Sequence, residues 1–316
     1  MKALVTGGAG FVGSHLSRRL AQLGWTISIL DVAEAPTDLA AMATVNRGSV
    51  LDAALTDRLI TEADFVIHMA GIAEPARYGA DPLATMDVNL LGTIAVARQC
   101  AQHGRPLLFA STSEIYGINP QVPWREDADR VLGPVSNVRW CYSSAKAAAE
   151  HYLQALRHKM GLDYTVVRCF NIYGPDLRGR VVDGFIRAAL TGEPLVVHGD
   201  GQQTRCFCYI DDAVEVLVRI VSQPVQCGAT YNIGSEIETS IADLARTIIR
   251  LAGGDSPLHA TPYSGLYDGF QDVTRRQPDI GAVCRDFDWS PTIRLEDGLS
   301  RAIAAARGQE PDADGR

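Results

Sequence analysis

The chain has 316 residues, 47% of them hydrophobic and 21% charged, so it can bury a substantial core in one large domain or two closely joined ones. Its formal net charge of -8, without any basic block, argues against nucleic acid as a partner. Seven cysteines without a CxxC pair favour a reducing compartment over a disulfide framework or a metal site. No apolar run approaches the ~20 residues that span a bilayer, so we expect a cytoplasmic protein and no membrane partner.

Short apolar runs alternate with helical periodicity along the first half of the chain, which is typical of βαβ units that feed a parallel sheet. The predicted buried strands comprise residues 2–6, 26–30, 65–68, 107–110 and 165–169. The predicted amphipathic helices comprise residues 11–23, 83–103 and 144–160. The sequence therefore predicts an α/β fold built on a doubly wound parallel sheet.

The pattern changes after Gly174, where proline and glycine become more frequent and the elements shorter. Helices are predicted near residues 182–190, 211–221 and 241–251. Cys206 and Cys208 flank Phe207 in an expected strand, where buried thiols are the simplest interpretation. We therefore expect a smaller C-terminal lobe, interleaved with the last strands of the sheet.

The strongest local motif is TGGAGFVGSHL, in which Gly7, Gly8, Gly10 and Gly13 follow a predicted strand and open a predicted helix. Glycine is needed where the backbone turns tightly and approaches a pyrophosphate, whose charge is met by free N–H groups at the helix N-terminus. Asp31 ends the next predicted strand, where a carboxylate accepts hydrogen bonds from the adenosine ribose and repels a 2′-phosphate. The spacing predicts a Rossmann domain that binds NAD in preference to NADP.

The domain boundaries follow from this motif. We expect residues 1–174 to form the NAD-binding Rossmann domain, with later strand and helix contributions from about 206–234. Residues 175–316 are expected to form mainly the substrate-binding lobe.

A second motif, YSSAK, places Tyr142 and Lys146 one helical turn apart at the start of a predicted helix. A free tyrosine has a pKa of ~10, so it acts as a base near neutrality only where its phenolate is stabilised. A lysine ammonium one turn away, beside a cationic nicotinamide, would supply that stabilisation. Such spacing alone is common on solvated helix faces. Its position after STSEIYG favours a proton-transfer pair.

A series of stretches along nearly the whole chain resembles the extended short-chain dehydrogenase/reductases that modify nucleotide sugars, the NAD-dependent epimerase/dehydratase family. They are TGGAGFVGSHL, NLLGT, STSEIYG, YSSAK, RCFNIYGP, GDGQQTRCFCYIDDAVE, YNIG, RRQPDI and WSPTIRLEDGL. Within that family EPARYGADP, GRVVDGFI and TRCF look most like UDP-glucuronate decarboxylases, also called UDP-xylose synthases. GPVSNVRWCYSSAK is similar to the decarboxylases that release a 4-keto-pentose.

The resemblance implies a reaction and its catalytic residues. Tyr142 would remove the proton from the sugar 4-hydroxyl while hydride passes to NAD, Lys146 would hold the ribose and lower the pKa of Tyr142, and Thr112 would bind the same oxygen. The resulting β-keto acid would lose carbon dioxide, with Ser113 and Glu114 near the carboxylate and Glu114 ordering water or relaying a proton. The expected product is UDP-xylose or the UDP-4-keto-pentose.

The resemblance also implies binding residues. The cofactor would contact Gly7, Gly10, Phe11, Val12, Gly13, Asp31, Ser49, Val50, Ala70, Asn89, Tyr142 and Lys146. The nucleotide sugar, UDP-linked in the family pattern, would contact Tyr78, Asn171, Arg180, Val182, Arg205 and Arg276. A surface salt bridge is the alternative for Arg180 and Arg276, and simple packing is the alternative for Tyr78.

Two positions depart from the family pattern, and three other functions remain open. Ser49 stands where an aspartate usually binds the adenine amino group, and His198 stands where a tyrosine is common. A nucleotide-sugar 4,6-dehydratase and a UDP-sugar 4-epimerase share the first oxidation, while a non-catalytic NAD-sensing protein would lack the Tyr142 and Lys146 pair. The resemblance further implies a homodimer, formed by pairing of the helices at 83–103 and 144–160.

Overall fold

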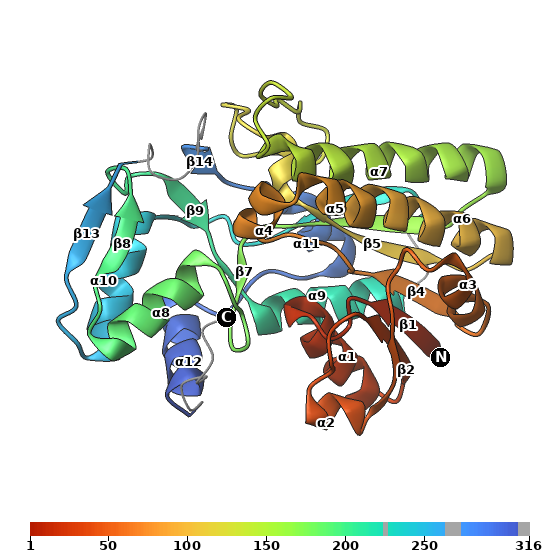
Figure 1. The fold of residues 1–316 in the computed structure, drawn as a ribbon, viewed down its shortest axis with the longest axis horizontal. Helices are drawn as coiled ribbons and strands as arrows, with labels where there is room; N and C mark the ends of the chain where they lie inside the picture. The colour runs from red at the N-terminus through yellow and green to blue at the C-terminus, as the bar shows by residue number, and fades with distance from the viewer. Residues whose placement is uncertain (224–226, 263–272, 309–316) are drawn as a thin grey trace.

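A parallel sheet of seven strands forms the centre of the computed structural model, which describes residues 1–223, 227–262 and 273–308 (Figure 1). The strand order is β11-β6-β5-β4-β1-β2-β3, and all the neighbouring pairs are parallel. The strands are β1 (Lys2–Thr6), β2 (Thr26–Asp31), β3 (Ala43–Arg47), β4 (Phe65–His68), β5 (Leu107–Thr112), β6 (Tyr164–Cys169) and β11 (Ala229–Ile233). The order reverses beside β1, so the carboxyl ends of β1 and β4 flank the crevice in which such sheets bind ligands.

Helices cover both faces of this sheet, as the doubly wound arrangement requires (Figure 1). One face carries α1 (Phe11–Gln22), α2 (Thr37–Ala40), α9 (Ile210–Ser222) and α11 (Gly281–Phe287). The other face carries α3 (Ala53–Thr61), α6 (Thr93–His103) and α7 (Trp140–Met160). Two separate apolar cores result, one on each side of the sheet. In the described part of the chain, no helix has the length and apolar character to cross a membrane.

The smaller lobe packs against the sheet side of the molecule. Its buried apolar side chains belong to the same hydrophobic core as those of α1 and α9. Its strands are β8 (Leu195–His198), β9 (Thr204–Cys206), β12 (Glu238–Ser240), β13 (Leu258–Thr261) and β14 (Arg275–Arg276), and its helices are α8 (Val181–Thr191), α10 (Ile241–Ala252) and α12 (Leu295–Gly308). β8 pairs with β13, and β9 lies between β12 and β14. The short strands β7 (Ile172–Tyr173) and β10 (Cys208–Tyr209) join the lobe to the sheet.

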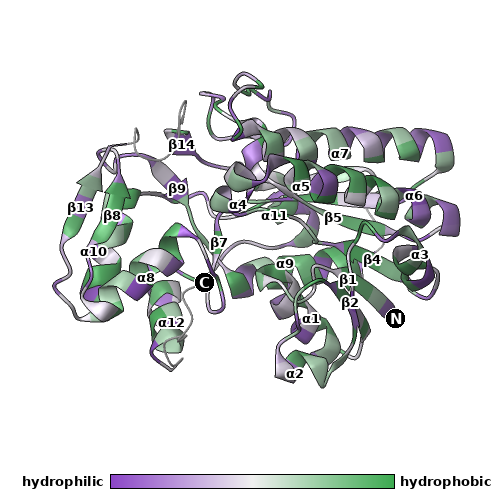
Figure 2. Ribbon diagram, viewed as in Figure 1, coloured by the Kyte–Doolittle hydropathy of each residue, from purple (hydrophilic) through white to green (hydrophobic). Residues whose placement is uncertain are grey.

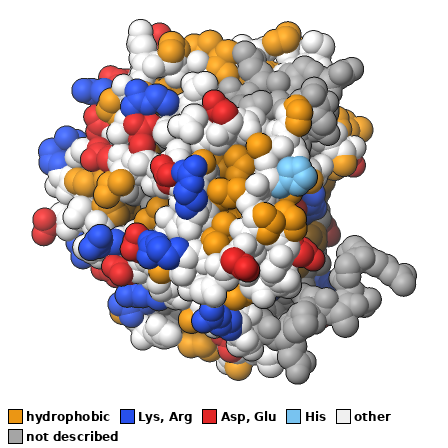
Figure 3. Space-filling view, turned by 90° about the vertical axis from the view of Figure 1, so that its left-hand side faces the viewer, with side chains coloured by type: hydrophobic (Ala, Val, Ile, Leu, Met, Phe, Trp, Pro, Cys, Tyr) orange, Lys and Arg blue, Asp and Glu red, His pale blue; other side chains and the backbone are white. Residues whose placement is uncertain are grey.

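Hydrophobic side chains are concentrated in the interior of the molecule, and most charged side chains lie on its surface. Hydrophobic residues follow the central strands and the inner faces of the helices (Figure 2). The outer face of the lobe mixes acidic and basic side chains with scattered apolar ones (Figure 3). Neither charge dominates that face.

The predicted fold class is confirmed, and the differences in detail have physical reasons. The predicted helix at 83–103 is divided into α5 (Pro82–Met86), a π-helix (Asp87–Gly92) and α6, because Asn89 donates its amide to the carbonyl of Thr85 and to that of Ile72. The edge strand β3 was not predicted, since its side chains are only partly buried and give no apolar run. α7 begins at Trp140, four residues before the predicted start. Phe207 separates β9 from β10, so the predicted strand at 206–208 is two strands.

A buried ion pair fixes the ends of β5 and β6 against α7. Arg168 donates to both carboxylate oxygens of Glu150, at 3.1 and 2.7 Å, and the two side chains are 9% and 11% exposed. Arg168 also donates to the Tyr116 hydroxyl and to the carbonyl of Glu126, at 2.7 Å each. This guanidinium therefore satisfies four acceptors from α7, the end of β5 and the loop beyond it.

Replacing Glu150 by alanine should lower the free energy of unfolding by about 3–5 kcal/mol, because the Arg168 charge would remain buried without its carboxylate. Chemical denaturation measures this loss. The matched control is Glu296→Ala, which removes the partner of Arg250 from an exposed pair and should cost less than about 1 kcal/mol. Equal losses in the two variants would contradict the prediction.

Candidate active site

A cavity of about 1010 Å³ opens between the carboxyl ends of the central strands and the lobe. Its size is at the upper end of small-molecule sites, which suits a dinucleotide together with a second ligand. All the site residues predicted from the sequence line this cavity except Asn89, which lies directly beneath the lining residue Gly71. No group of three potential metal ligands occurs within residues 1–223, 227–262 and 273–308.

The glycine loop between β1 and α1 packs backbone against backbone. Gly7 has a φ of +70°, and a Cβ at this residue would lie 2.6 Å from the amide nitrogen of Ala70 at the end of β4. A Cβ at Gly13 would lie 2.2 Å from the carbonyl oxygen of Gly7. The absence of side chains lets the loop turn closely over the sheet, and Gly10 caps a helix of 12 residues at the cavity. The free N–H groups of this helix end suit a phosphate.

Asp31 lies at the carboxyl end of β2, beside the glycine loop. One carboxylate oxygen accepts from the Ala9 amide at 3.0 Å, and the other accepts from the Ala33 amide at 3.0 Å. Each oxygen keeps a further lone pair for a ribose hydroxyl. Ser49 and Val50 line the cavity nearby, and the Ser49 hydroxyl accepts from the Leu51 amide at 3.1 Å. This hydroxyl replaces the carboxylate expected in the family pattern.

Asn89 and Lys146 meet at Gly71, on the floor of the cavity. The Asn89 amide group donates to two carbonyls, while its oxygen is buried without a hydrogen-bond partner. A Cβ at Gly71 would lie 2.5 Å from that oxygen and 3.4 Å from Lys146 Nζ. An unsatisfied acceptor beside an ammonium fits a ligand with vicinal hydroxyls, such as the ribose of a dinucleotide. The residues present therefore fit NAD.

Lys146 itself is held in a buried position. Its Nζ donates to the carbonyl of Ala110 at 2.9 Å and lies 4.7 Å from the centre of the Phe109 ring. Burial lowers the pKa of Lys146 to about 8. The amine is thus mostly charged at neutral pH, although neutral pH is close to its pKa.

Tyr142 occupies the first turn of α7 and is buried. Burial raises its pKa to about 12, although a hydrogen bond with the Thr112 side chain opposes that rise. At Tyr142 burial outweighs the neighbouring charges in this structure, so the expected lowering of its pKa by Lys146 stays a prediction. The ring of Tyr78 stacks on that of Tyr142, with centroids 5.5 Å apart and an interplanar angle of 3°.

Glu114 lies in the short helix Ser113–Tyr116, which follows β5, and its carboxylate forms ion pairs with two arginines. Its Oε1 accepts from Arg276 Nη1 at 2.8 Å, and its Oε2 lies 3.7 Å from Arg139 Nη2. Burial alone would raise the pKa of Glu114, but the Arg276 and Arg139 charges outweigh it and hold the pKa at about 2. Glu114 is therefore an ionised carboxylate at neutral pH.

This cluster settles one alternative and adds one residue. Arg276 was expected to add charge or ribose contacts, with a surface salt bridge as the alternative. Its ion pair with Glu114 is buried, so the surface pair is wrong, while contact with a ligand stays a prediction. Arg139 was not among the predicted site residues, although it lines the cavity and is only 6% exposed. The unusual Arg139-Trp140 pair shortly before YSSAK was the only sequence feature that could have indicated this residue. Sequence spacing alone does not connect Arg139 with Glu114.

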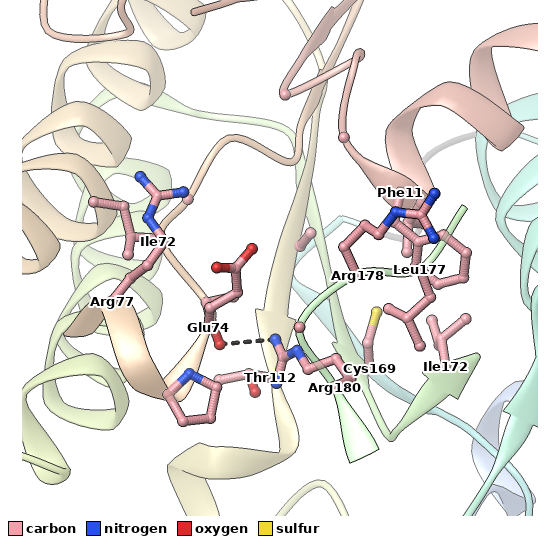
Figure 4. Close-up of a pocket in the computed structure, with 18 of the residues that line it drawn as sticks. Phe11, Ile72, Glu74, Arg77, Thr112, Cys169, Ile172, Leu177, Arg178 and Arg180 are labelled. Atoms are coloured by element: carbon pink, nitrogen blue, oxygen red, sulfur yellow. Dashed lines mark hydrogen bonds between the residues drawn. The ribbon is translucent and has the colours of Figure 1, made fainter. Parts of the chain in front are cut away.

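The remaining predicted residues face the same cavity from the lobe side. Arg180 reaches across to the segment after β4, where its Nη2 donates to the carbonyl of Ala73 at 2.7 Å, with Thr112 and Cys169 nearby (Figure 4). The Asn171 amide donates to the carbonyl of Cys206 at 3.0 Å. Arg205 Nη1 donates to two backbone carbonyls, at 2.8 and 2.7 Å. Val182 is buried at the start of α8.

Comparison with known proteins places this geometry among nucleotide-sugar enzymes. The model of the NAD dependent epimerase/dehydratase family matches residues 3–234, in agreement with the NAD cofactor predicted from the sequence. A UDP-N-acetyl-alpha-D-glucosaminuronate decarboxylase of Bacillus cytotoxicus is 35% identical over 98% of this chain and 99% of its own length. UDP-glucuronic acid decarboxylase 1 of Xenopus tropicalis is 34% identical over 96% of this chain and 71% of its length. The crystal structure of a Thermotoga maritima UDP-glucose 4-epimerase with UDP-glucose has a TM-score of 0.88 and 27% identity, covering 98% of this chain and 99% of that one.

Asp31→Ala should weaken NAD binding about tenfold or more, because a charged acceptor for the ribose is removed, and should narrow the preference for NAD over NADP. Dissociation constants for both cofactors, measured by calorimetry, test this. The control is Glu34→Ala, which removes an equal charge from the nearby surface pair with Arg47. Unchanged NAD affinity in the Asp31 variant would contradict the assignment.

Proposed function

Because this chain belongs to the NAD dependent epimerase/dehydratase family, we propose that it oxidises C4 of a UDP-linked hexuronate and then removes the C6 carboxyl group as carbon dioxide. Two relatives that match almost the whole chain carry the name decarboxylase, which supports this proposal. The charges in the cavity support it independently.

The charge balance around Glu114 is the observation that carries the proposal. Arg276 and Arg139 contact this carboxylate, and Arg180 adds a third positive charge within range. Three guanidiniums around one buried carboxylate leave an excess of positive charge at this part of the cavity. A second carboxylate, on C6 of the substrate, would balance this excess. A sugar with a neutral hydroxymethyl group at C6 would leave it uncompensated.

The oxidation step needs a base at the 4-hydroxyl. Tyr142 would accept that proton, with Thr112 hydrogen-bonding to the same oxygen, since their side chains already interact. Bound NAD would supply the hydride acceptor for C4 and the hydride donor for the ketone. Lys146 and Asn89 would orient the ribose through the ammonium and the unsatisfied amide oxygen. Because burial raises the pKa of Tyr142, a positive charge close to its hydroxyl would favour the phenolate that accepts the proton.

Carbon loss needs little more from the protein. A ketone at C4 makes the C6 carboxylate a β-keto acid, and the bonding electrons between C5 and C6 move into the C4 carbonyl as an enolate. Tyr142 and Thr112 can hydrogen-bond to the enolate oxygen. Arg276 and Arg139 would orient the departing carboxylate, while Glu114 holds these two guanidiniums in place.

The dehydratase alternative makes a different demand on Glu114. A 4,6-dehydratase would use this carboxylate as a free base at C5, whereas both of its oxygens are here directed at guanidiniums. A hexuronate epimerase would share the carboxylate site but retain the carboxyl group. Product analysis separates these reactions.

The sugar differs between the two named relatives at C2, which carries a hydroxyl in glucuronate and an acetamido group in N-acetylglucosaminuronate. We propose UDP-glucuronate as the substrate, with UDP-xylose or the UDP-4-keto-pentose as product. The 2-acetamido sugar is the second compound to examine, because the relative named for it matches this chain over nearly its full length.

The outer helices suggest how two copies associate. Leu83 and Leu91 are 71% and 52% exposed beside α7, whose outer face carries the small exposed residues Ser144, Ala148 and Ala155. We propose a homodimer in which these helices pair across a two-fold axis. Light scattering should give twice the chain mass in 0.15 M salt, and a monomer mass at micromolar concentration would contradict this assembly.

Incubation of the purified protein with NAD and UDP-glucuronate should release carbon dioxide and yield a pentose or 4-keto-pentose nucleotide, identified by mass. The same assay with UDP-N-acetylglucosaminuronate tests the C2 group, and UDP-glucose serves as the substrate without a carboxylate. An isomer of unchanged mass would support epimerisation and reject the proposal.

Arg276→Leu should reduce kcat/KM for the hexuronate about 100-fold or more, because it removes the guanidinium that would meet the substrate carboxylate. The matched control is Arg275→Leu, since Arg275 is the neighbouring arginine, pairs with Glu238 and does not line the cavity. Its kcat/KM should stay near that of the unmodified protein. Equal turnover in the two variants would remove Arg276 from the site.

A further inference from the structure

We propose that the Tyr78 hydroxyl donates the proton that C5 of the sugar receives after the carboxyl group has left, an assignment that rests on the decarboxylation proposed above. Tyr78 is buried, lines the cavity and belongs to α4 (Pro75–Ala80) on the loop after β4. Nothing in the oxidation step requires it.

The position of Tyr78 follows from its contact with Tyr142. The two rings are parallel, with an interplanar angle of 3° and centroids 5.5 Å apart. The carbonyl of Tyr78 also accepts from Cys141 Sγ at 3.9 Å, so α4 is anchored to the residue before Tyr142. A sugar whose 4-oxygen meets Tyr142 therefore presents the adjoining carbon atoms to the neighbouring phenol. C5 is bonded directly to C4.

Tyr78 lines the same cavity as Tyr142, Glu114, Arg139, Arg180 and Arg276. The charges of Glu114 and Arg180 influence the pKa of both phenol hydroxyls, and those of Arg139 and Arg276 influence that of Tyr78 as well. The Tyr78 phenol is therefore part of the same charged region as the groups assigned to the C6 carboxylate.

Glu114 is unsuited to this proton transfer. Its carboxylate is ionised at neutral pH and both of its oxygens are directed at Arg276 and Arg139. Burial raises the pKa of the Tyr78 hydroxyl above its usual range, so this phenol carries its proton throughout the neutral pH region. An enolate carbon is a strong enough base to accept it.

The proposed step balances as follows. Cleavage of the bond between C5 and C6 releases carbon dioxide and leaves its electron pair as a C4 enolate. The Tyr78 O–H bond then breaks, its proton forms the new C5–H bond, and the enolate electrons restore the C4 carbonyl. The resulting phenolate, near Arg139, Arg276 and Arg180, regains a proton from solvent.

Turnover in deuterium oxide tests this assignment, with borohydride quenching at early times to prevent exchange in a ketone product. The unmodified protein should place one deuterium in a single C5 position of the pentose. Tyr78→Phe should slow the steady-state formation of the pentose nucleotide about 100-fold or more and distribute deuterium between both C5 positions, because water replaces the directed donor. Its single-turnover oxidation, followed by absorbance, should persist.

Two controls keep the result decisive. Tyr164→Phe removes a hydroxyl that donates to Gln154 away from the cavity, and it should label and turn over normally. Binding of UDP and circular dichroism verify that Tyr78→Phe folds, and Tyr78→His, which restores an aromatic proton donor, should recover single-position labelling if the phenylalanine variant is unstable.

Each outcome bears on a different conclusion. Single-position labelling in Tyr78→Phe, at normal or reduced rate, would overturn the role of Tyr78 while leaving the decarboxylation intact. Failure of the unmodified protein to release carbon dioxide from either hexuronate would overturn the proposed function and this assignment with it.

Discussion

The buried carboxylate of Glu114 is the constraint on which the active site depends. An ionised carboxylate removed from water is costly unless positive groups surround it, and here they come from separate parts of the chain. Arg139 is supplied at the start of α7 and Arg276 by the lobe strand β14, while Glu114 follows the central strand β5. Balancing this one charge thus fixes the positions of the sheet, α7 and the lobe relative to one another.

This arrangement divides the chemistry between charged and neutral groups. The charges of Arg276 and Arg139 lower the pKa of Glu114 to about 2, so this group stays ionised near neutral pH and cannot easily donate a proton. Tyr142 and Tyr78 have raised pKa values because of burial, so they hold their protons until a charge develops nearby. The site therefore combines charged groups that bind anions with neutral phenols that can transfer protons. An oxidation followed by carbon loss requires both kinds of group.

Local signals made much of the site predictable from the sequence. These signals are the glycine motif, Asp31 and the Tyr142–Lys146 spacing. Each is encoded within a short stretch of sequence, where strand and helix periodicity determine the geometry. The pair of Glu114 with Arg276 joins residues 162 positions apart, and no periodicity encodes such a contact. The π-helix around Asn89 and the edge strand β3 were missed for a related reason, since a side-chain hydrogen bond and a partly exposed edge leave little hydrophobic pattern.

The packing of the glycine loop has a consequence for how this sequence can change by descent. Gly13 is excluded from bearing a side chain by the carbonyl of Gly7, and Gly7 by the backbone of Ala70, so neither restriction involves a ligand. A descendant that lost its cofactor would still be under selection to keep these glycines, merely to fold. In such a descendant the glycines would indicate only that the loop keeps its fold. Retention of Asp31 and of Asn89, with its unsatisfied oxygen, would indicate that the protein still binds the dinucleotide.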